Sequence, residues 1–150
     1  MTFFETIDIE IPLGVSGQGL TEFRKQFDNK GTCIRAALII QGTLPVEPID
    51  IKIKDTTGAT ILPSIDYTMF PKPNGNANYI DCMMPLTFNQ NKIVVSTNVT
   101  TPLNSIFRAK LLFLFMTEDA VTKRNEMVDK GIVDPIFSIN KETNRSTCKI

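Results

Sequence analysis

Few residues of this chain are suited to catalysis, because its 150 residues include no histidine. Histidine is the commonest general base near neutral pH and a leading metal ligand, so its absence removes the usual nucleophile–base pairs and most zinc or copper sites. Carboxylate pairs and a Ser–Lys pair stay open, but no motif selects one. We therefore expect no catalytic residue, no metal ligand, no cofactor and no enzymatic activity.

The run Asp55-Thr56-Thr57-Gly58 is close to the Asp-Thr-Gly loop of aspartic proteases. The additional threonine breaks that motif, and Lys54 stands where an apolar residue would support the loop. A catalytic carboxylate dyad would also need a second copy of the motif. We interpret the run as a hairpin turn, with Gly58 free to adopt a positive φ.

Two other polar segments could hold a ligand. The first contains Gly14, Gly17 and Gly19, whose spacing matches neither a dinucleotide-binding nor a phosphate-binding loop. Its G-x-x-G also lacks the basic flanking residues of an RNA-binding module. We therefore predict a mobile connector there. The loop Pro71–Asn78 could offer oxygens to calcium or to a sugar beside Tyr67 or Tyr79. We predict an exposed loop there and keep a ligand site as the alternative; its candidate groups are Asn74, Asn76, Asn78 and Asp81.

The three cysteines, Cys33, Cys82 and Cys148, are widely spaced and odd in number. The N-terminal residues lack the pattern of a secretion signal, so we expect free thiols in a reducing compartment, with Cys33 and Cys82 buried and Cys148 exposed. The longest apolar run, Leu111–Met116, is far shorter than the 18 or so residues of a membrane helix.

Apolar residues alternate with polar ones in one short segment after another, which predicts strands rather than helices. Ile7–Ile11 and Ile49–Lys54 alternate most cleanly, while Leu20–Phe27 has the spacing of a short helix or turn and Thr117–Lys130 that of a capped helix. The further predicted strands are Cys33–Ile40, Ala59–Leu62, Tyr79–Met84, Lys92–Val99, Ile106–Met116 and Ile136–Ile139, with Ile65–Phe70 as a possible extension of the sheet.

These elements predict an all-β protein, an antiparallel β-sandwich of about eight strands with one or two short helices. A jelly roll fits eight strands joined by loops of mixed length, and an immunoglobulin-like sandwich is the alternative. We expect one domain over residues 1–140 and a polar tail over 141–150. Phe3, Phe4 and the tail are interpreted as arms that order on neighbouring subunits, and Ile106–Met116 as a core strand or an edge covered by another chain.

Lys plus Arg equals Asp plus Glu at 16 each, so the net charge is zero and no basic excess points to nucleic acid. In broad layout the chain resembles the small jelly rolls of icosahedral virus shells. That architectural resemblance implies a non-enzymatic structural protein of the virion, a minor capsid or vertex protein assembled in the host cytoplasm and packed against copies of itself or other subunits. The alternative functions are a carbohydrate-binding sandwich and an enzyme that uses carboxylates alone. If the protein is not part of a virion, we expect it in the cytoplasm.

Purified protein should therefore contain no stoichiometric zinc, copper or iron, because the side chains that usually bind these metals are absent or scattered. Elemental analysis after dialysis measures this directly, and one metal ion per chain would contradict the interpretation. Calcium is the least excluded ion, since oxygen ligands alone can hold it.

Overall fold

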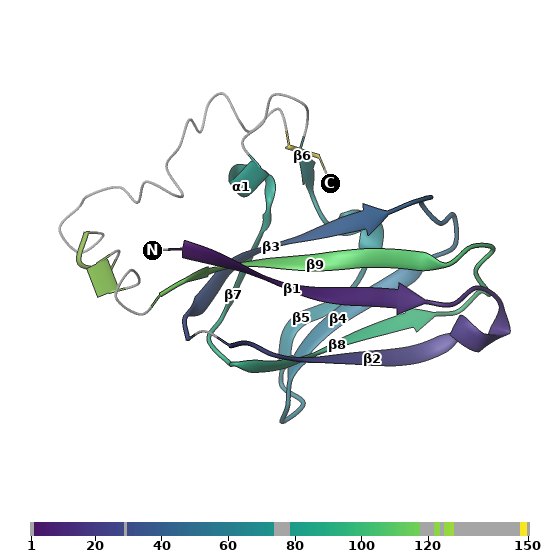
Figure 1. Cartoon of the computed structure of the whole chain (residues 1–150), viewed down its shortest axis with the longest axis horizontal. Helices are drawn as coiled ribbons and strands as arrows, with labels where there is room; N and C mark the ends of the chain where they lie inside the picture. The colour runs from purple at the N-terminus through teal and green to yellow at the C-terminus, as the bar shows by residue number, and fades with distance from the viewer. Residues whose placement is uncertain are drawn as a thin grey trace.

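The computed structural model describes residues 2–28, 30–73, 79–117, 122–123, 125–127 and 148–149. In this part of the chain, eight strands form two four-stranded antiparallel sheets that pack face to face (Figure 1). The all-β antiparallel sandwich expected from the sequence is confirmed. The two sheets are built entirely from residues 2–116.

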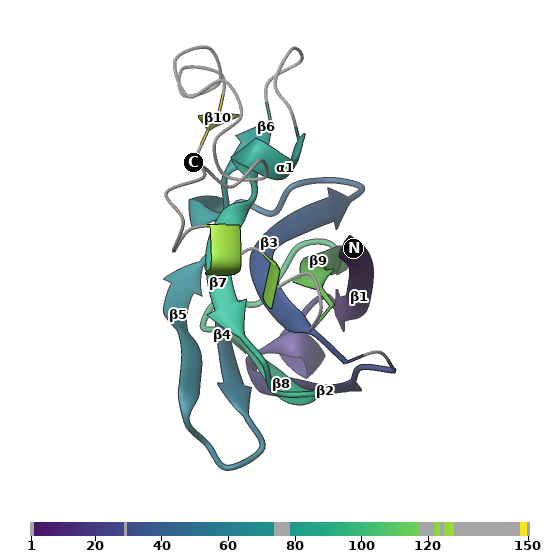
Figure 2. The same cartoon turned by 90° about the vertical axis from the view of Figure 1, so that its left-hand side faces the viewer.

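The first sheet has the order β1 (Thr2–Ile11), β9 (Phe107–Met116), β3 (Thr32–Gln41) and β7 (Met84–Phe88). The second has the order β2 (Gly19–Gln26), β8 (Lys92–Val99), β4 (Ile49–Asp55) and β5 (Thr60–Asp66). Short helical elements are η1 (Val15–Gly17), η2 (Tyr67–Met69) and α1 (Tyr79–Cys82). Figure 2 shows α1 beside a small ribbon made by β6 (Lys72–Pro73) and β10 (Cys148–Lys149).

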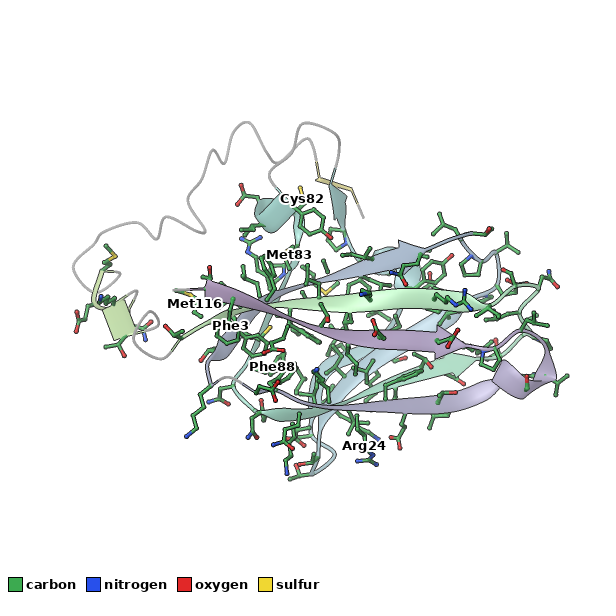
Figure 3. The ribbon with its side chains drawn as sticks, in the orientation of Figure 1. Phe3, Arg24, Cys82, Met83, Phe88 and Met116 are labelled. Carbon is green, nitrogen blue, oxygen red and sulfur yellow. The ribbon has the colours of Figure 1, made fainter. Side chains whose placement is uncertain are left out.

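The core lies between the sheets and is filled by every second residue of each strand, as the pleat requires. In β1, Ile7, Ile9 and Ile11 are buried while Asp8 and Glu10 face solvent, which confirms the alternation seen in the sequence. One half of the core is aromatic: neighbouring rings among Phe3, Phe27, Phe88, Phe113 and Phe115 have centroids 4.9–6.4 Å apart. Figure 3 labels two of these residues, Phe3 and Phe88.

The prediction that the N-terminal residues form an arm on a neighbouring subunit is wrong. Residues 2–11 pair one to one with β9, and the Phe3 ring stacks on Phe115 at 5.3 Å between centroids. The first residues therefore complete the subunit's own sheet. By contrast, the core interpretation of Ile106–Met116 is confirmed, because β9 lies between β1 and β3 and pairs with both.

The helix or turn predicted over Leu20–Phe27 is also wrong, because Gly19–Gln26 forms strand β2. The helical spacing of three apolar residues was coincidental: Leu20 is exposed, whereas Phe27 is buried beyond the end of the strand. Alternate residues of β2 face outward, and Arg24 points away from the core in Figure 3. Pairing along the whole length of β8 supplies the hydrogen bonds that decide the conformation.

The predicted strand Tyr79–Met84 is replaced by helix α1, and β7 begins only at Met84. A β-bulge in β3 after Cys33 turns Arg35 out of the core, toward α1. There the Arg35 guanidinium donates to the carbonyl oxygens of Ile80, Asp81 and Met83 at 2.9, 3.1 and 3.3 Å. A cation at carbonyls near the end of this helical turn stabilises it.

Several expectations fall on residues that the structure does not describe. The strand Ile136–Ile139 and the tail over 141–147 lie outside the described part, as does most of the helix predicted over Thr117–Lys130. Residues 148 and 149 belong to β10 rather than to a tail without structure. No helix in the described part of the chain combines the length and apolarity needed to cross a bilayer.

Replacing Phe113 by Ala should lower the free energy of unfolding by about 3–5 kcal/mol, because a fully buried ring at the centre of the aromatic cluster leaves a cavity. Urea denaturation followed by circular dichroism measures the change. Thr6→Ala, on the exposed face of β1, is the control and should stay within about 0.5 kcal/mol of the wild type. Equal effects of the two substitutions would contradict the described core.

Candidate functional site

The Asp55 run forms the predicted hairpin turn. Asp55 Oδ1 accepts hydrogen bonds from the Thr57 hydroxyl at 2.6 Å and from the amides of Thr57 and Ala59 at 2.9 Å, and Gly58 has a φ of +96°. The hydrogen bond from the Thr57 hydroxyl is the largest cause of a lowered pKa for the Asp55 carboxyl. The carboxylate is thus occupied in holding its own turn, which accounts for the run structurally.

The calcium or sugar site that was the alternative for the 71–78 loop cannot be built from the described residues. Asn74, Asn76 and Asn78 lie outside them, and Asp81 belongs to α1. Of the two tyrosines beside the loop, Tyr67 is buried and donates to the carbonyl oxygen of Pro45. Among the described residues, no three cysteine, aspartate or glutamate side chains cluster as metal ligands would.

The expectation of three free thiols is wrong for Cys82, which is disulfide-bonded. Cys33 is free and buried in β3, as expected, and desolvation raises the pKa of its thiol from 9.0 to about 12. The exposure of the Cys148 side chain lies outside the described residues. Disulfides are rare in reducing compartments, so the expectation of such a compartment loses the support that it drew from free thiols.

A different feature emerges at one end of the sandwich, where three strand connections meet. These are residues 12–18 between β1 and β2, 42–48 between β3 and β4, and 100–106 between β8 and β9; we call them together the loop end. They lie at the end toward which the arrows of β1 and β3 point in Figure 1. The sheets bring together segments that are far apart in the sequence.

Hydrogen bonds join the first connection to the third. The Gly14 amide donates to the Leu103 carbonyl oxygen at 2.9 Å, and Gln18 Nε2 donates to the Thr100 carbonyl oxygen at 2.8 Å. A Cβ added to Gly17 would lie 1.9 Å from the Pro12 carbonyl oxygen, so only glycine fits this close approach. The glycine-rich segment is therefore the connector predicted from the sequence, but a tight one fixed by contacts rather than a mobile one.

The second connection is tied to the third and to the core. Glu47 Oε1 accepts a hydrogen bond from the Asn104 amide at 3.1 Å, and Glu47 is only 8% exposed. The buried Tyr67 ring beneath Pro45 packs against Phe107 at 5.7 Å between centroids. All three connections thus have fixed anchors in the sandwich.

The loop end presents five apolar side chains to solvent, beside the exposed polar side chains of Ser16, Gln18, Thr43, Thr100, Thr101 and Asn104. The exposed fractions of the apolar side chains reach 77% for Val15 and 90% for Val46, and the other members are Leu13, Leu44 and Ile106. The three connections contain a single charged residue, Glu47, and its side chain is buried. Exposed apolar side chains on neighbouring connections that present no charge are typical of protein interaction sites.

The opposite end of the sandwich has a different character. A hollow of about 450 Å³ opens there between the start of β3 and the turn from β7 to β8. Its walls carry Lys30 and the side chains of Asn89, Gln90 and Asn91, over a floor that includes Phe115. The apolar exposure at the loop end is therefore not a general property of this protein's connections.

Reasoning from the sequence missed the loop end. Each connection is an ordinary stretch of Pro, Gly, Ser and Thr, and its one or two apolar residues carry no pattern. One sequence feature could have indicated this surface: the three connections contain only one charged residue, whereas 21% of all residues in the chain are charged. Their proximity, however, depends on the strand pairing. No protein-family model matches the chain, and no curated protein matches it.

The Cys33 thiol should resist labelling in the folded protein, because it is buried and its desolvation raises the pKa of the thiol to about 12, which leaves very little thiolate at pH 8. Ellman's reagent should release almost no thiol from the native protein. It should release one thiol per chain after unfolding in guanidinium without reductant, since one disulfide occupies two of the three cysteines. Rapid labelling of the native protein would contradict the burial of Cys33.

Proposed function

We propose that this protein is a non-enzymatic structural subunit that packs through its loop end against copies of itself. The observation that carries the proposal is the exposure of five apolar side chains on three connections whose only charge is buried. Fully burying a Val, Leu or Ile side chain contributes about 1.5–3 kcal/mol. Five such groups supply a sizeable part of the free energy needed for association.

Two further properties favour packing at this surface. The connections are held by hydrogen bonds to one another, so association would order few additional residues and its entropic cost would be low. The net charge of zero creates no long-range repulsion between identical chains. From the sequence, the subunit contact was expected at an N-terminal arm. Because residues 2–5 belong to β1, we assign this contact to the loop end instead.

We also propose that the sandwich is a jelly roll. Its pairing is nested from the ends of the sequence inward: β1 with β9, β2 with β8, β3 with β7 and β4 with β5. Such a nested hairpin rolls into two sheets when β9 pairs with β3 and β8 pairs with β4. This order supports a pair of Greek keys over an immunoglobulin-like arrangement.

The specific role that we propose is a minor capsid or vertex protein of a virion. Small jelly rolls recur as shell subunits, and the loop end offers the kind of contact that a shell requires. A disulfide at Cys82 is compatible with that location, since disulfides persist on virion surfaces. This role rests on the architecture and the loop end, since no motif of the sequence carries it.

The test is the oligomeric state of the full chain, measured by sedimentation velocity over a hundredfold range of concentration. We expect a discrete oligomer, and Val46→Asp should raise its dissociation constant at least tenfold because a carboxylate would be buried in an apolar contact. Phe4→Asp is the matched control: Phe4 is 51% exposed, like Leu44 at the loop end, but it lies at the start of β1.

Both variants should retain the strand signal and cooperative unfolding of the wild type. A wild-type protein that is monomeric at every concentration would refute self-packing. Equal weakening by Val46→Asp and Phe4→Asp would show that the loop end is not the contact.

A further inference from the structure

The charges on the outer face of the second sheet are unevenly distributed, although the net charge of the chain is zero. Strand pairing places the even-numbered residues of β2, β8 and β4 on this face. From Glu22 to the end of β2, these residues and their partners include one acidic side chain, Glu22, and four basic ones: Arg24, Lys52, Lys54 and Lys92. This half of the face is therefore positively charged.

A hollow of about 400 Å³ opens in this part of the molecule. The last residues of β2, the first residues of β8 and the turn between β4 and β5 form its walls. Its polar side chains are Arg24, Lys25, Gln26, Thr56 and Lys92, and we call it the basic hollow. Every one of these side chains can donate a hydrogen bond, and no carboxylate among the described residues lines the hollow. The lining therefore favours an anion.

The carboxylate of Glu22 neutralises only part of the positive charge. Glu22 Oε2 lies 2.8 Å from Lys54 Nζ, whereas Oε1 lies 3.7 Å from Arg24, whose side chain is 70% exposed. One carboxylate is thus shared between two cations. Lys25 and Lys92 form no ion pair within the described part of the chain, so the charges of both are available to a ligand.

The backbone around the basic hollow is fixed. β2 pairs with β8 along its whole length without a shift in register. The turn is held by Asp55, whose Oδ1 accepts hydrogen bonds from the amides of Thr57 and Ala59 at 2.9 Å. That carboxylate is therefore directed into its own turn, while the neighbouring Thr56 lines the hollow. Binding of a ligand would order side chains but little backbone, which keeps its entropic cost low.

We propose that the basic hollow binds a sulfated sugar unit of a sulfated polysaccharide. A sulfate group carries a permanent negative charge, and its oxygens accept hydrogen bonds from ammonium, guanidinium and hydroxyl donors. Ligand pockets commonly measure about 300–1,000 Å³, so the hollow has room for a sugar ring together with its sulfate group. Lys52 and Lys54 continue the positive surface along β4, where a second sulfate of the same chain can bind.

A nucleic acid would be attracted by the same cations, but this face lacks what a single strand needs besides charge. None of the outward residues of β2, β8 and β4 is aromatic, so no side chain on these strands offers a platform on which a base could stack. A single strand would be held by its phosphates alone. A sulfated polysaccharide has no bases to stack, and charge with hydrogen bonding suffices for it.

The basic hollow and the loop end lie at opposite ends of the second sheet. β2 begins beside the loop end at Gly19 and reaches the hollow at its last residue, Gln26. In Figure 3 the Arg24 side chain points away from the sandwich. A neighbouring subunit packed on the loop end would leave the hollow open, so binding of a polysaccharide is a property additional to the proposed assembly.

The experiment is a titration of isotope-labelled full-length protein with a heparin-derived hexasaccharide, followed by amide NMR shifts. Amides around Gln26, Thr56 and Lys92 should shift in a saturable way. The same hexasaccharide without its sulfate groups should bind at least tenfold more weakly. Raising the salt concentration from about 50 to about 200 mM should weaken binding on the order of tenfold, because salt ions compete for the charged groups.

Substitutions separate a defined site from a general effect of charge. Lys25→Gln and Lys92→Gln should each weaken binding at least fivefold. Lys110→Gln is the matched control, because it removes the same charge from the outer face of the other sheet, where Lys110 Nζ lies 3.8 Å from Asp8. It should change binding less than twofold. All three variants should unfold cooperatively like the wild type, since each of these lysines is at least partly exposed.

Shifts that do not saturate, equal binding of the desulfated hexasaccharide, or equal effects of Lys92→Gln and Lys110→Gln would each overturn the proposal. Hexathymidylate, a short single strand of DNA, should bind more weakly than the sulfated hexasaccharide. Equal or tighter binding of that strand would assign the hollow to nucleic acid and would also overturn the proposal. Val46→Asp lies at the loop end and should bind the hexasaccharide like the wild type, so failure of the assembly proposal is distinguishable from failure of this one.

Discussion

The pairing of β9 with both of its neighbours is the constraint on which the rest of this structure depends. β9 is hydrogen-bonded to β1 along its full length and to β3 along most of it, so it unites the N-terminal, middle and later parts of the chain in one sheet. Its inward face carries Phe107, Phe113 and Phe115, which pack across the sandwich. Burial of these rings fixes the distance and register between the sheets. The ends of the strands, and hence the positions of the connections, follow from that register.

The loop end shows how the core controls a surface. Leu103 is buried and ties the third connection to the sandwich, while the buried Tyr67 of η2 holds the second connection by donating to the Pro45 carbonyl oxygen. Glu47 uses its carboxylate to hold the Asn104 backbone amide. Once these groups are satisfied internally, the remaining side chains of the connections, Val15 and Val46 among them, have no place in the core. Their exposure is therefore a consequence of well-anchored loops rather than of poor folding.

Most of the sheet could be predicted from the sequence because its signals are local. Alternation placed Ile7–Ile11 and Ile49–Lys54 correctly, and the continuous apolar run Leu111–Met116 marked the central strand. The prediction failed where tertiary contacts decide the conformation. Residues 19–26 form a strand because β8 supplies a partner, and residues 79–82 form a helical turn whose carbonyl oxygens accept hydrogen bonds from Arg35.

The loop end could not be predicted from the sequence. It joins three connections that are far apart in the chain and contains no continuous motif. Leu20 follows directly on the first connection but belongs to β2, on the outer face of the second sheet. Packing through Val15 and Val46 therefore engages the end of the sandwich, whereas packing through Leu20 would engage its face. The proposed assembly uses the end, because the exposed apolar side chains there come from three anchored connections.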